Sequence, residues 1–582
     1  MTKKNNITLL LIISVVAACT KTDIEPNIIF KNASVYTVNK KQPWASSVVV
    51  QNEKIIFVGS DDDALAFTNR NSQIIDLNKK MILPGFHDIH VHPVHGGVTF
   101  LQCNLTDIRG IDNLLSKIKN CAEEKGPNEW VLGGGWAVDN FSAMKLPDKK
   151  MLDEIVPDKP VSLKSSDGHS LWANSIALEI SNINESTIDP KNGAIERYPN
   201  SREPSGLLHE DSAMMLVMDN HPELTNKELI DGLKYSRDEF HRLGITGVQD
   251  ALLKLDPGDP YFGLDAYNYL DDRNELNLHV VTAMFWNNGQ PLKPQLERFK
   301  RVREKQKNSK NVKATSIKIW QDGVIETYTA AMKEPYSDRA DLFSGELQNQ
   351  PSKLNAAIQA LDAEGFQIHF HAIGDAAIRA SLDAIEAARS INGEKDNRHH
   401  ISHIQLFNPA DIPRFAELGV AANFQPYWAW ADKFITELTI PKLGEERSQW
   451  LYPIKSLLDS GALVVFGSDW FVSSGNPLLG IETAITRRDP LTNKSEPFLD
   501  HQRIGLSAAL KAYTLNSAYI NFIDHETGSI EVGKQADLTV LDKNLFDLKS
   551  SEISEASVML TLIDGKRVYG EWSLKPQGKT AL

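Results

Sequence analysis

Cysteine is scarce in this chain, with three residues among 582. So low a content excludes a scaffold held mainly by disulfide bonds, and a hydrophobic content of 41% is enough for an ordinary packed core. Runs of basic residues interleaved with aromatic side chains are also lacking, and the net charge is −14. Nucleic acid is therefore not expected as a partner, and the acidity is most simply a solubility feature.

Internal repeats and low-complexity segments are absent as well, which excludes a solenoid and a long disordered chain. At about 100–200 residues per domain, the length allows three or four domains. A single large α/β barrel with insertions also accommodates most of such a length.

The N-terminus, "MTKKNNITLLLIISVVAAC", has two lysines, a short apolar run and small residues leading to Cys19. The run is shorter than the roughly 20 residues of a membrane span and is typical of an export signal. "VAAC" resembles the bacterial lipobox, whose cysteine is lipidated. We expect residues 1–18 to be a signal peptide and 19–27 a lipidated tether, which would anchor the protein in a membrane of the bacterial cell envelope, facing the periplasm. The alternative is a plain signal peptide with an incidental cysteine.

The other two cysteines, Cys103 and Cys121, lie in one segment of the chain. Because an exported chain meets an oxidising compartment, we predict that they form a disulfide bond. The alternative is a pair of free, buried thiols.

Both ends of the chain are rich in short β-type runs. Residues 28–81 contain "NIIFKNASVYTV" and "SSVVVQNEKIIFVGS", and residues 526–582 contain "GSIEVGKQADLTVLD". The pair Asp564-Gly565 is a strong hairpin signal. We predict one small β-sandwich built from these two segments.

The middle of the chain, residues 82–525, alternates eight short apolar runs with helix-like stretches. The runs are "MILPGFHDIHVH", "GITGVQDA", "LNLHVVTAMFW", "ATSIKIWQDG", "GFQIHFHAIGD", "HHISHIQLF", "GVAANFQPYW" and "ALVVFGSDW". Strands that alternate with helices pair in parallel, so eight such units predict an α/β fold of the (β/α)₈ TIM-barrel type. The first connection is too long for a simple loop, and we assign residues 101–240 to an insertion.

Four histidines fall within nine positions of "LPGFHDIHVHPVHGG". His90 and His92 are two residues apart, so their side chains point to the same face of a strand. Two imidazoles on one face near a strand end suit a divalent metal, and in a barrel the chemistry lies at that end. Alone, the pattern is weak, because a polar loop rich in histidine looks the same.

Further polar residues occur at the ends of later predicted strands. His371 ends the fifth strand, His403 the sixth and Asp469 the eighth, while Lys318 lies on the fourth. Each has a structural alternative, a hydrogen-bonded core residue or a salt-bridge partner. Together at successive strand ends they predict a metal centre.

The ordered motifs resemble the amidohydrolase superfamily, specifically family 3, and are similar to N-substituted formamide deformylases. "PGFHDIHVHP", "FHAIGDAAI", "HHISHIQ", "GSDW" and "GSIEVGKQADLTVLD" match in order over nearly all of the chain after the signal. The resemblance implies a metal-dependent hydrolase with one or two divalent ions, and zinc is the expected metal. It assigns the ligands as follows: His90, His92 and Asp469 to the first metal, His371 and His403 to the second, and carboxylated Lys318 as the bridge. One departure is Ser402, where a glutamate is expected before His403.

The resemblance also implies hydrolysis of non-peptide carbon–nitrogen bonds such as amides or formamides. A divalent metal lowers the pKa of bound water to about 7, and Asp469 would take the water proton and pass it to the leaving group. Candidate contacts to a small substrate with an aromatic or apolar group are His169, Trp136 and Gln425, although each also suits a structural role.

Other reactions and other roles stay open at this point. The same metal site would serve an isomerase or a hydratase, and a degenerate barrel would serve a lipid-anchored binding or regulatory protein. The complete ligand set disfavours the latter. Of the remaining histidines, we expect His87 and His95 in solvated loops, and His369 and His399 in the core.

Overall fold

The computed structural model describes residues 27–572, apart from residues 107, 142–145, 167, 192 and 257–261. The predicted signal peptide and the lipidated Cys19 lie outside the described residues. Within the described part of the chain, no helix is both long and apolar enough to cross a membrane.

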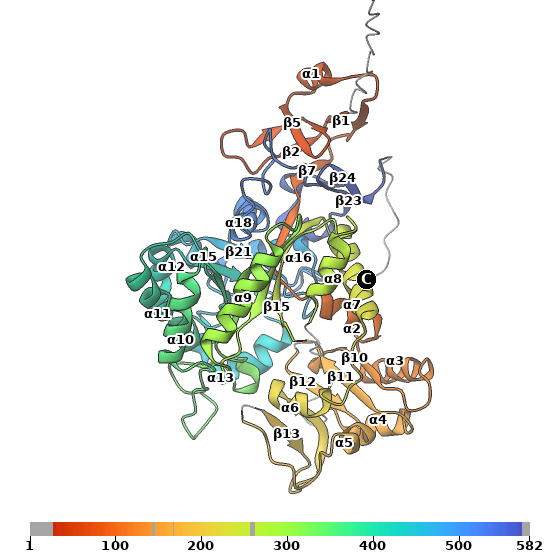
Figure 1. Cartoon of the computed structure of the whole chain (residues 1–582), viewed down its shortest axis with the longest axis vertical. Helices are drawn as coiled ribbons and strands as arrows, with labels where there is room; N and C mark the ends of the chain where they lie inside the picture. The colour runs from red at the N-terminus through yellow and green to blue at the C-terminus, as the bar shows by residue number, and fades with distance from the viewer. Residues whose placement is uncertain are drawn as a thin grey trace, which may run out of the picture.

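Eight parallel strands form the centre of the molecule, in the order in which they occur along the chain (Figure 1). They are β8 (Phe86–Val91), β15 (Ile245–Leu253), β16 (His279–Phe285), β17 (Val312–Trp320), β18 (Gln367–Ala372), β19 (His400–His403), β20 (Ala421–Phe424) and β21 (Val464–Phe466). Every predicted strand is present. The first and last strands meet where His92 N donates to Trp470 O at 2.8 Å and Asp469 N to His90 O at 2.7 Å. The predicted α/β barrel is confirmed.

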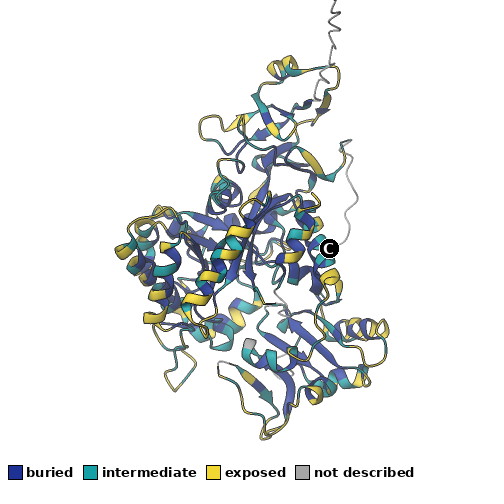
Figure 2. Cartoon of the chain, in the orientation of Figure 1, coloured by how far each residue is buried: buried dark blue, intermediate teal, exposed yellow. Residues whose placement is uncertain are grey.

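Helices surround the barrel strands, and their solvent faces are exposed while the strands are buried (Figure 2). They are α7 (Asn226–Arg242), α8 (Leu264–Asp271), α9 (Leu292–Gln306), α10 (Pro351–Ala363), α11 (Asp375–Asn392), α12 (Ile412–Leu418), α13 (Ile440–Leu443), α14 (Glu445–Ser448), α15 (Ile454–Asp459), α16 (Pro477–Thr486), α17 (Leu506–Ala512) and α18 (Leu515–Ile520). Local sequence sets their starts. Helix α7, for example, begins with a capping box in which Thr225 and Glu228 satisfy each other's backbone amides.

An inserted domain separates α2 (Pro93–Leu101) from α7. Its sheet has the order β13-β14-β12-β11-β10-β9. The strands are β9 (Cys103–Asn104), β10 (Val131–Trp136), β11 (Val161–Ser165), β12 (Ser170–Ala173), β13 (Ala194–Arg197) and β14 (Pro204–His209); the helices are α3 (Ile111–Glu123), α4 (Lys149–Ile155), α5 (Ser175–Ile180) and α6 (Glu210–Met218). A disulfide bond between Cys103 and Cys121 joins β9 to α3. The domain lies below the barrel in Figure 1, away from the terminal sheets.

The two ends of the chain meet in a pair of sheets at the top of Figure 1. One contains β1 (Asn27–Lys31), β4 (Ser47–Gln51), β5 (Lys54–Gly59) and β6 (Gln73–Asp76), with the short helix α1 (Asp61–Ala64) beside them; the other contains β2 (Ser34–Tyr36), β3 (Trp44–Ala45), β7 (Met81–Pro84), β22 (Leu538–Leu541), β23 (Val558–Ile563) and β24 (Lys566–Gly570). Phe30 and Val48 from the first sheet share a core with Leu538 and Leu560 from the second.

A buried ion pair links the barrel to the terminal sheets. His279 begins β16, and Asp537 precedes β22; their Nε2 and Oδ2 atoms are 2.9 Å apart. Burial alone would lower the pKa of His279, but Asp537 raises it to about 9. The backbone N–H of Asp564 donates to the second oxygen of Asp537 at 2.8 Å, which ties the β23–β24 turn to the same carboxylate. The junction therefore contains a charged pair with defined partners.

Breaking this pair should lower stability in a pH-dependent way. Because the folded-state pKa of His279 is raised, its contribution is fully present below its ordinary pKa of 6.5 and is lost as pH rises through about 9. We predict that His279→Asn lowers the melting temperature relative to the parent at pH 6 and that the difference shrinks at pH 10. Thermal melts at both pH values measure this, with the exposed His501→Asn as control. An equal difference at both pH values would contradict it.

The disulfide should stabilise the inserted domain. Its two cysteines are 18 residues apart. In the chain-entropy model, closing a loop of about this length stabilises the folded state by roughly 3 kcal/mol. We predict that the double variant Cys103→Ser, Cys121→Ser lowers the free energy of unfolding by up to about this amount. Urea denaturation followed by tryptophan fluorescence measures the change. Mass spectrometry of unreduced peptides provides the control, and finding both thiols free would rule out the bond.

Candidate metal centre

Three side chains converge where β8 and β21 end. His90 lies on β8, His92 follows it, and Asp469 follows β21. The Oδ1 atom of Asp469 is 3.0 Å from His92 Nε2 and 3.6 Å from His90 Nε2. One nitrogen or oxygen atom from each residue lies within 4.8 Å of the other two. The grouping that the family resemblance implies for the first metal therefore has its three side chains close together.

The donor set fits a divalent metal. Asp469 Oδ1 is buried and accepts no hydrogen bond from the described residues, so a cation is the missing partner that would satisfy it. Two imidazole nitrogens and a carboxylate oxygen are ligands that zinc prefers. His90, His92 and Asp469 would hold this ion.

A hydrogen-bond network fixes the tautomer of His90. Gln249 Oε1 accepts from His369 Nδ1 at 2.7 Å and from His400 Nε2 at 2.9 Å. Because Nδ1 of His369 carries the proton, its Nε2 accepts, and it lies 2.8 Å from Ser402 Oγ and 3.1 Å from His90 Nδ1. His90 therefore donates from Nδ1 and keeps the lone pair of Nε2 for a metal.

This network gives His369 and Ser402 roles that the sequence did not indicate. His369 is buried, as expected of a core residue, but it also orients a candidate ligand. Ser402, which departs from the family pattern, contacts His369 rather than His403. The expected support of His403 comes instead from Gln425, whose Oε1 is 2.8 Å from His403 Nδ1. Gln425 is fully buried beneath the site, so the predicted substrate contact is wrong.

His403 and His371 form the second predicted pair. Their ring centroids are 4.5 Å apart, and His403 Nδ1 is 4.0 Å from Asp469 Oδ2. His403 donates from Nδ1 to Gln425, and His371 Nε2 lies 3.3 Å from the carbonyl oxygen of Gly323. In each ring the other nitrogen keeps a lone pair. Both rings are thus prepared as ligands beside the first group.

Lys318 lies beside the first group of ligands. Its Nζ is 3.3 Å from His90 Nε2, and the side chain is buried. Burial lowers the pKa of Lys318 to about 7, although Asp469 and Asp250 act in the opposite direction. A substantial fraction of the amine is then neutral at neutral pH, which is the form that reacts with carbon dioxide.

Burial also keeps the histidines neutral. It lowers the pKa of His371 to about 3 and holds the pKa values of His90 and His403 well below the ordinary histidine value, with Lys318 adding to the effect in all three. A neutral imidazole is the form that binds a metal. At neutral pH these residues are therefore ready to act as ligands without first losing a proton.

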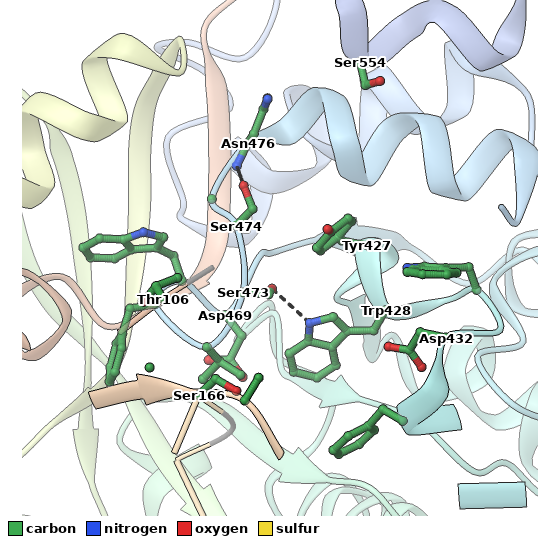
Figure 3. Close-up of a pocket in the computed structure, with 18 of the residues that line it drawn as sticks. Thr106, Ser166, Tyr427, Trp428, Asp432, Asp469, Ser473, Ser474, Asn476 and Ser554 are labelled. Atoms are coloured by element: carbon green, nitrogen blue, oxygen red, sulfur yellow. Dashed lines mark hydrogen bonds between the residues drawn. The ribbon is translucent and has the colours of Figure 1, made fainter. Parts of the chain in front are cut away.

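A cavity of about 1080 Å³ opens above these residues, and His371, His403 and Asp469 form part of its wall. Figure 3 shows Thr106 and Ser166 of the inserted domain and Asp469 and Trp428 of the barrel bordering this space. The Trp428 ring stacks on His403 with centroids 5.7 Å apart, and its Nε1 donates to Ser473 at 2.9 Å. Further aromatic residues of the wall are Phe100, Phe141, Trp430, Phe434, Trp470 and Phe471.

His169 reaches the same cavity from the inserted domain, and its contact with substrate stays a prediction. Its Nδ1 is 3.0 Å from Glu210 Oε2. The hydroxyl groups of Thr327 and Thr329 donate to the other oxygen of Glu210 at 2.8 and 3.0 Å. Sequence reasoning missed Glu210, because nothing in "LHEDSAM" distinguishes it from a surface acid.

Three further expectations are wrong. Trp136 lies in the core of the inserted domain and donates to Leu163 O at 2.8 Å, whereas its neighbours Gly135 and Ala137 face the cavity. His87 is fully buried on β8 rather than in a solvated loop. His95 lies in α2 with both ring nitrogens shielded from solvent.

His399, by contrast, occupies the core as expected. Its Nε2 lies 3.1 Å from Asp362, and its Nδ1 accepts from the backbone N–H of Ile368.

Comparison with known proteins identifies the family of this chain. The chain is 32% identical over 557 residues to the protein LONG AFTER FAR-RED 3 of Arabidopsis thaliana, covering 94% of this chain and 92% of that one. It is 25% identical over 545 residues to the N-substituted formamide deformylase of Arthrobacter pascens, covering 92% and 97%. The crystal structure of an uncharacterized metal-dependent hydrolase from Pyrococcus horikoshii superimposes with a TM-score of 0.70 at 23% identity, covering 90% and 99%. Residues 73–569 match the model of the amidohydrolase family. The chain belongs to the amidohydrolase family.

Proposed function

We propose that this protein is a metal-dependent hydrolase of non-peptide carbon–nitrogen bonds, with amides and formamides of bulky amines as substrates. The observation that carries the proposal is the convergence of His90, His92 and Asp469 at the mouth of a closed barrel, at the base of a large cavity. The Oδ1 atom of Asp469 is buried and accepts no hydrogen bond from the described residues, which supports a bound cation at this position.

The chemistry divides between the metal and the side chains. When bound, the metal supplies an activated water and polarises the substrate carbonyl. Asp469 takes the proton of the attacking water, because its carboxylate faces the position between His90 and His92. His90 keeps its ligating nitrogen fixed, since His369 holds its ring in one tautomer. The cavity wall around Trp428 shields the reacting atoms from bulk water.

The cavity supports a substrate with an aromatic or apolar group. Its volume exceeds what a simple formyl or acetyl group needs, and aromatic side chains from both the barrel and the inserted domain line it. The name of the Arthrobacter pascens relative, N-substituted formamide deformylase, indicates the same class of bond. We propose that the bulky group belongs to the amine part of the substrate and occupies the cavity. The small acyl part would then lie at the metal.

We further propose a second metal at His371 and His403. A lysine cation between two divalent ions would be strongly repelled, whereas a carboxylated Lys318 would carry one negative charge shared by two oxygens, which suits a bridging ligand. The buried Nζ beside His90 and the lowered pKa of its amine support this modification. Zinc suits both groups of ligands.

Replacing Asp469 should prevent the transfer of a proton from the attacking water to this side chain. We predict that Asp469→Asn lowers turnover by about 10²-fold or more, since the amide keeps the shape and one ligand oxygen but cannot act as the base. The assay is a panel of N-formyl and N-acyl amines on metal-loaded protein, with metal content measured in parallel. Asp500→Asn, at an exposed position, is the control. Parental turnover in a metal-replete Asp469→Asn would exclude the role.

Replacing Lys318 should distinguish one metal from two. We predict that Lys318→Ala loses one metal ion per chain and most activity, because the second ion keeps only two protein ligands. Lys318→Glu should retain more metal, since glutamate supplies a carboxylate of shorter reach. The measurement is metal per chain after loading with and without bicarbonate, which should raise the content of the parent alone. Two metals and normal turnover in Lys318→Ala would overturn the carboxylated lysine.

A further inference from the structure

The inserted domain contributes a second histidine–carboxylate pair to the cavity. His169 precedes β12 and Glu210 begins α6, and these elements are held together by a backbone hydrogen bond from Glu210 N to His169 O at 2.9 Å. Their side chains meet at 3.0 Å. Glu210 has a φ of 63°, in the left-handed region that non-glycine residues seldom adopt. The position of the carboxylate is therefore set by backbone and side-chain contacts together.

Glu210 is fixed as an anion. Burial alone would raise the pKa of Glu210, but His169 and the hydroxyls of Thr327 and Thr329 lower it to about 2. With both oxygens accepting, the carboxylate has no proton to give, so His169 donates from Nδ1. The orientation of the imidazole then directs its reactivity through Nε2.

His169 is placed for chemistry with the same substrate as the metal ligands. It borders the cavity together with His371, His403 and Asp469. Among the imidazoles of the described cavity wall, His371 and His403 belong to the candidate metal groups, and His169 does not.

We propose that His169 is the proton donor to the leaving amine, and that Glu210 is the residue that positions it. This inference rests on the proposed hydrolysis and deepens it. Asp469 takes the proton of the attacking water as the new carbon–oxygen bond forms. The carbon–nitrogen bond then breaks with its electron pair on nitrogen, and the proton on His169 Nε2 moves to that nitrogen. Asp469 returns its proton to bulk water, and His169 takes one back from it, so the products are a carboxylic acid and a free amine.

A dependence on the leaving group separates this role from simple substrate binding. An alkylamine must be protonated before it leaves, whereas 4-nitroaniline leaves with little help from an acid. If His169 only held the substrate, its loss would affect both compounds alike, chiefly through KM. If it donates the proton, its loss must lower kcat for the alkyl amide far more than for the anilide.

The experiment compares His169→Asn, Glu210→Gln and the control His209→Asn with the parent. His209 is adjacent to Glu210, but its side chain contacts Ser170 and Glu196 and does not border the cavity. The substrates are a matched pair, an N-formyl arylalkylamine and N-formyl-4-nitroaniline. We expect His169→Asn to lower kcat by about 10²-fold or more for the first and by less than about tenfold for the second, with unchanged metal content. Glu210→Gln should also lower kcat more for the first substrate than for the second, but by a smaller factor. His209→Asn should leave kcat unchanged for both.

Each other result has a distinct meaning. Equal losses on both substrates, or a loss of metal in His169→Asn, would overturn the proton-donor role while leaving the hydrolase intact. A parent that cleaves no amide or formamide in the panel would overturn the proposed function and this inference with it.

Discussion

The site depends on the closure of the barrel between β8 and β21. Two short backbone hydrogen bonds, from His92 to Trp470 and from Asp469 to His90, join segments separated by almost 380 positions in the sequence. Each bond involves a candidate metal ligand, so the contact that closes the sheet also sets the distances among the ligands. A loose seam would separate Asp469 from the histidines before it affected any other part of the barrel.

Buried polar side chains around Gln249 support the candidate ligands through a hydrogen-bond network. The amide oxygen of Gln249 accepts hydrogen bonds from His369 and His400, and its amide nitrogen donates to Gln367 and Asn521. These contacts fix the orientation of the amide. Both polar atoms of the Gln249 amide have partners, so rotating this amide would break hydrogen bonds to buried groups. The orientation of the candidate ligand His90 is therefore set by residues that are not themselves candidate ligands.

Sequence periodicity was sufficient for the barrel and for the candidate ligands. Alternation of strands and helices determines the order of a parallel sheet, and strand ends in a barrel converge, so His90, His371 and Asp469 were found from position alone. The residues of the inserted domain that line the cavity were harder to predict, because its sequence does not indicate which face of its sheet meets the cavity. Trp136 is an example of such a wrong prediction. Its neighbours Gly135 and Ala137 line the cavity, and because side chains alternate along a strand, that of Trp136 points to the opposite side. His169 and Glu210 are 41 positions apart in the sequence, and only the folded arrangement reveals that they form a pair.

The terminal sheets have a consequence for the order in which the chain is completed. Strand β7 pairs with β2 from the beginning of the chain and with β22 from near its end. The apolar side chains of residues 27–84 are therefore fully covered only once the final strands have been synthesised and have returned across the whole barrel. During synthesis, β7 is therefore exposed until β22 has been made. A truncation near the C-terminus that removes β22 would expose the apolar side chains that β22 covers.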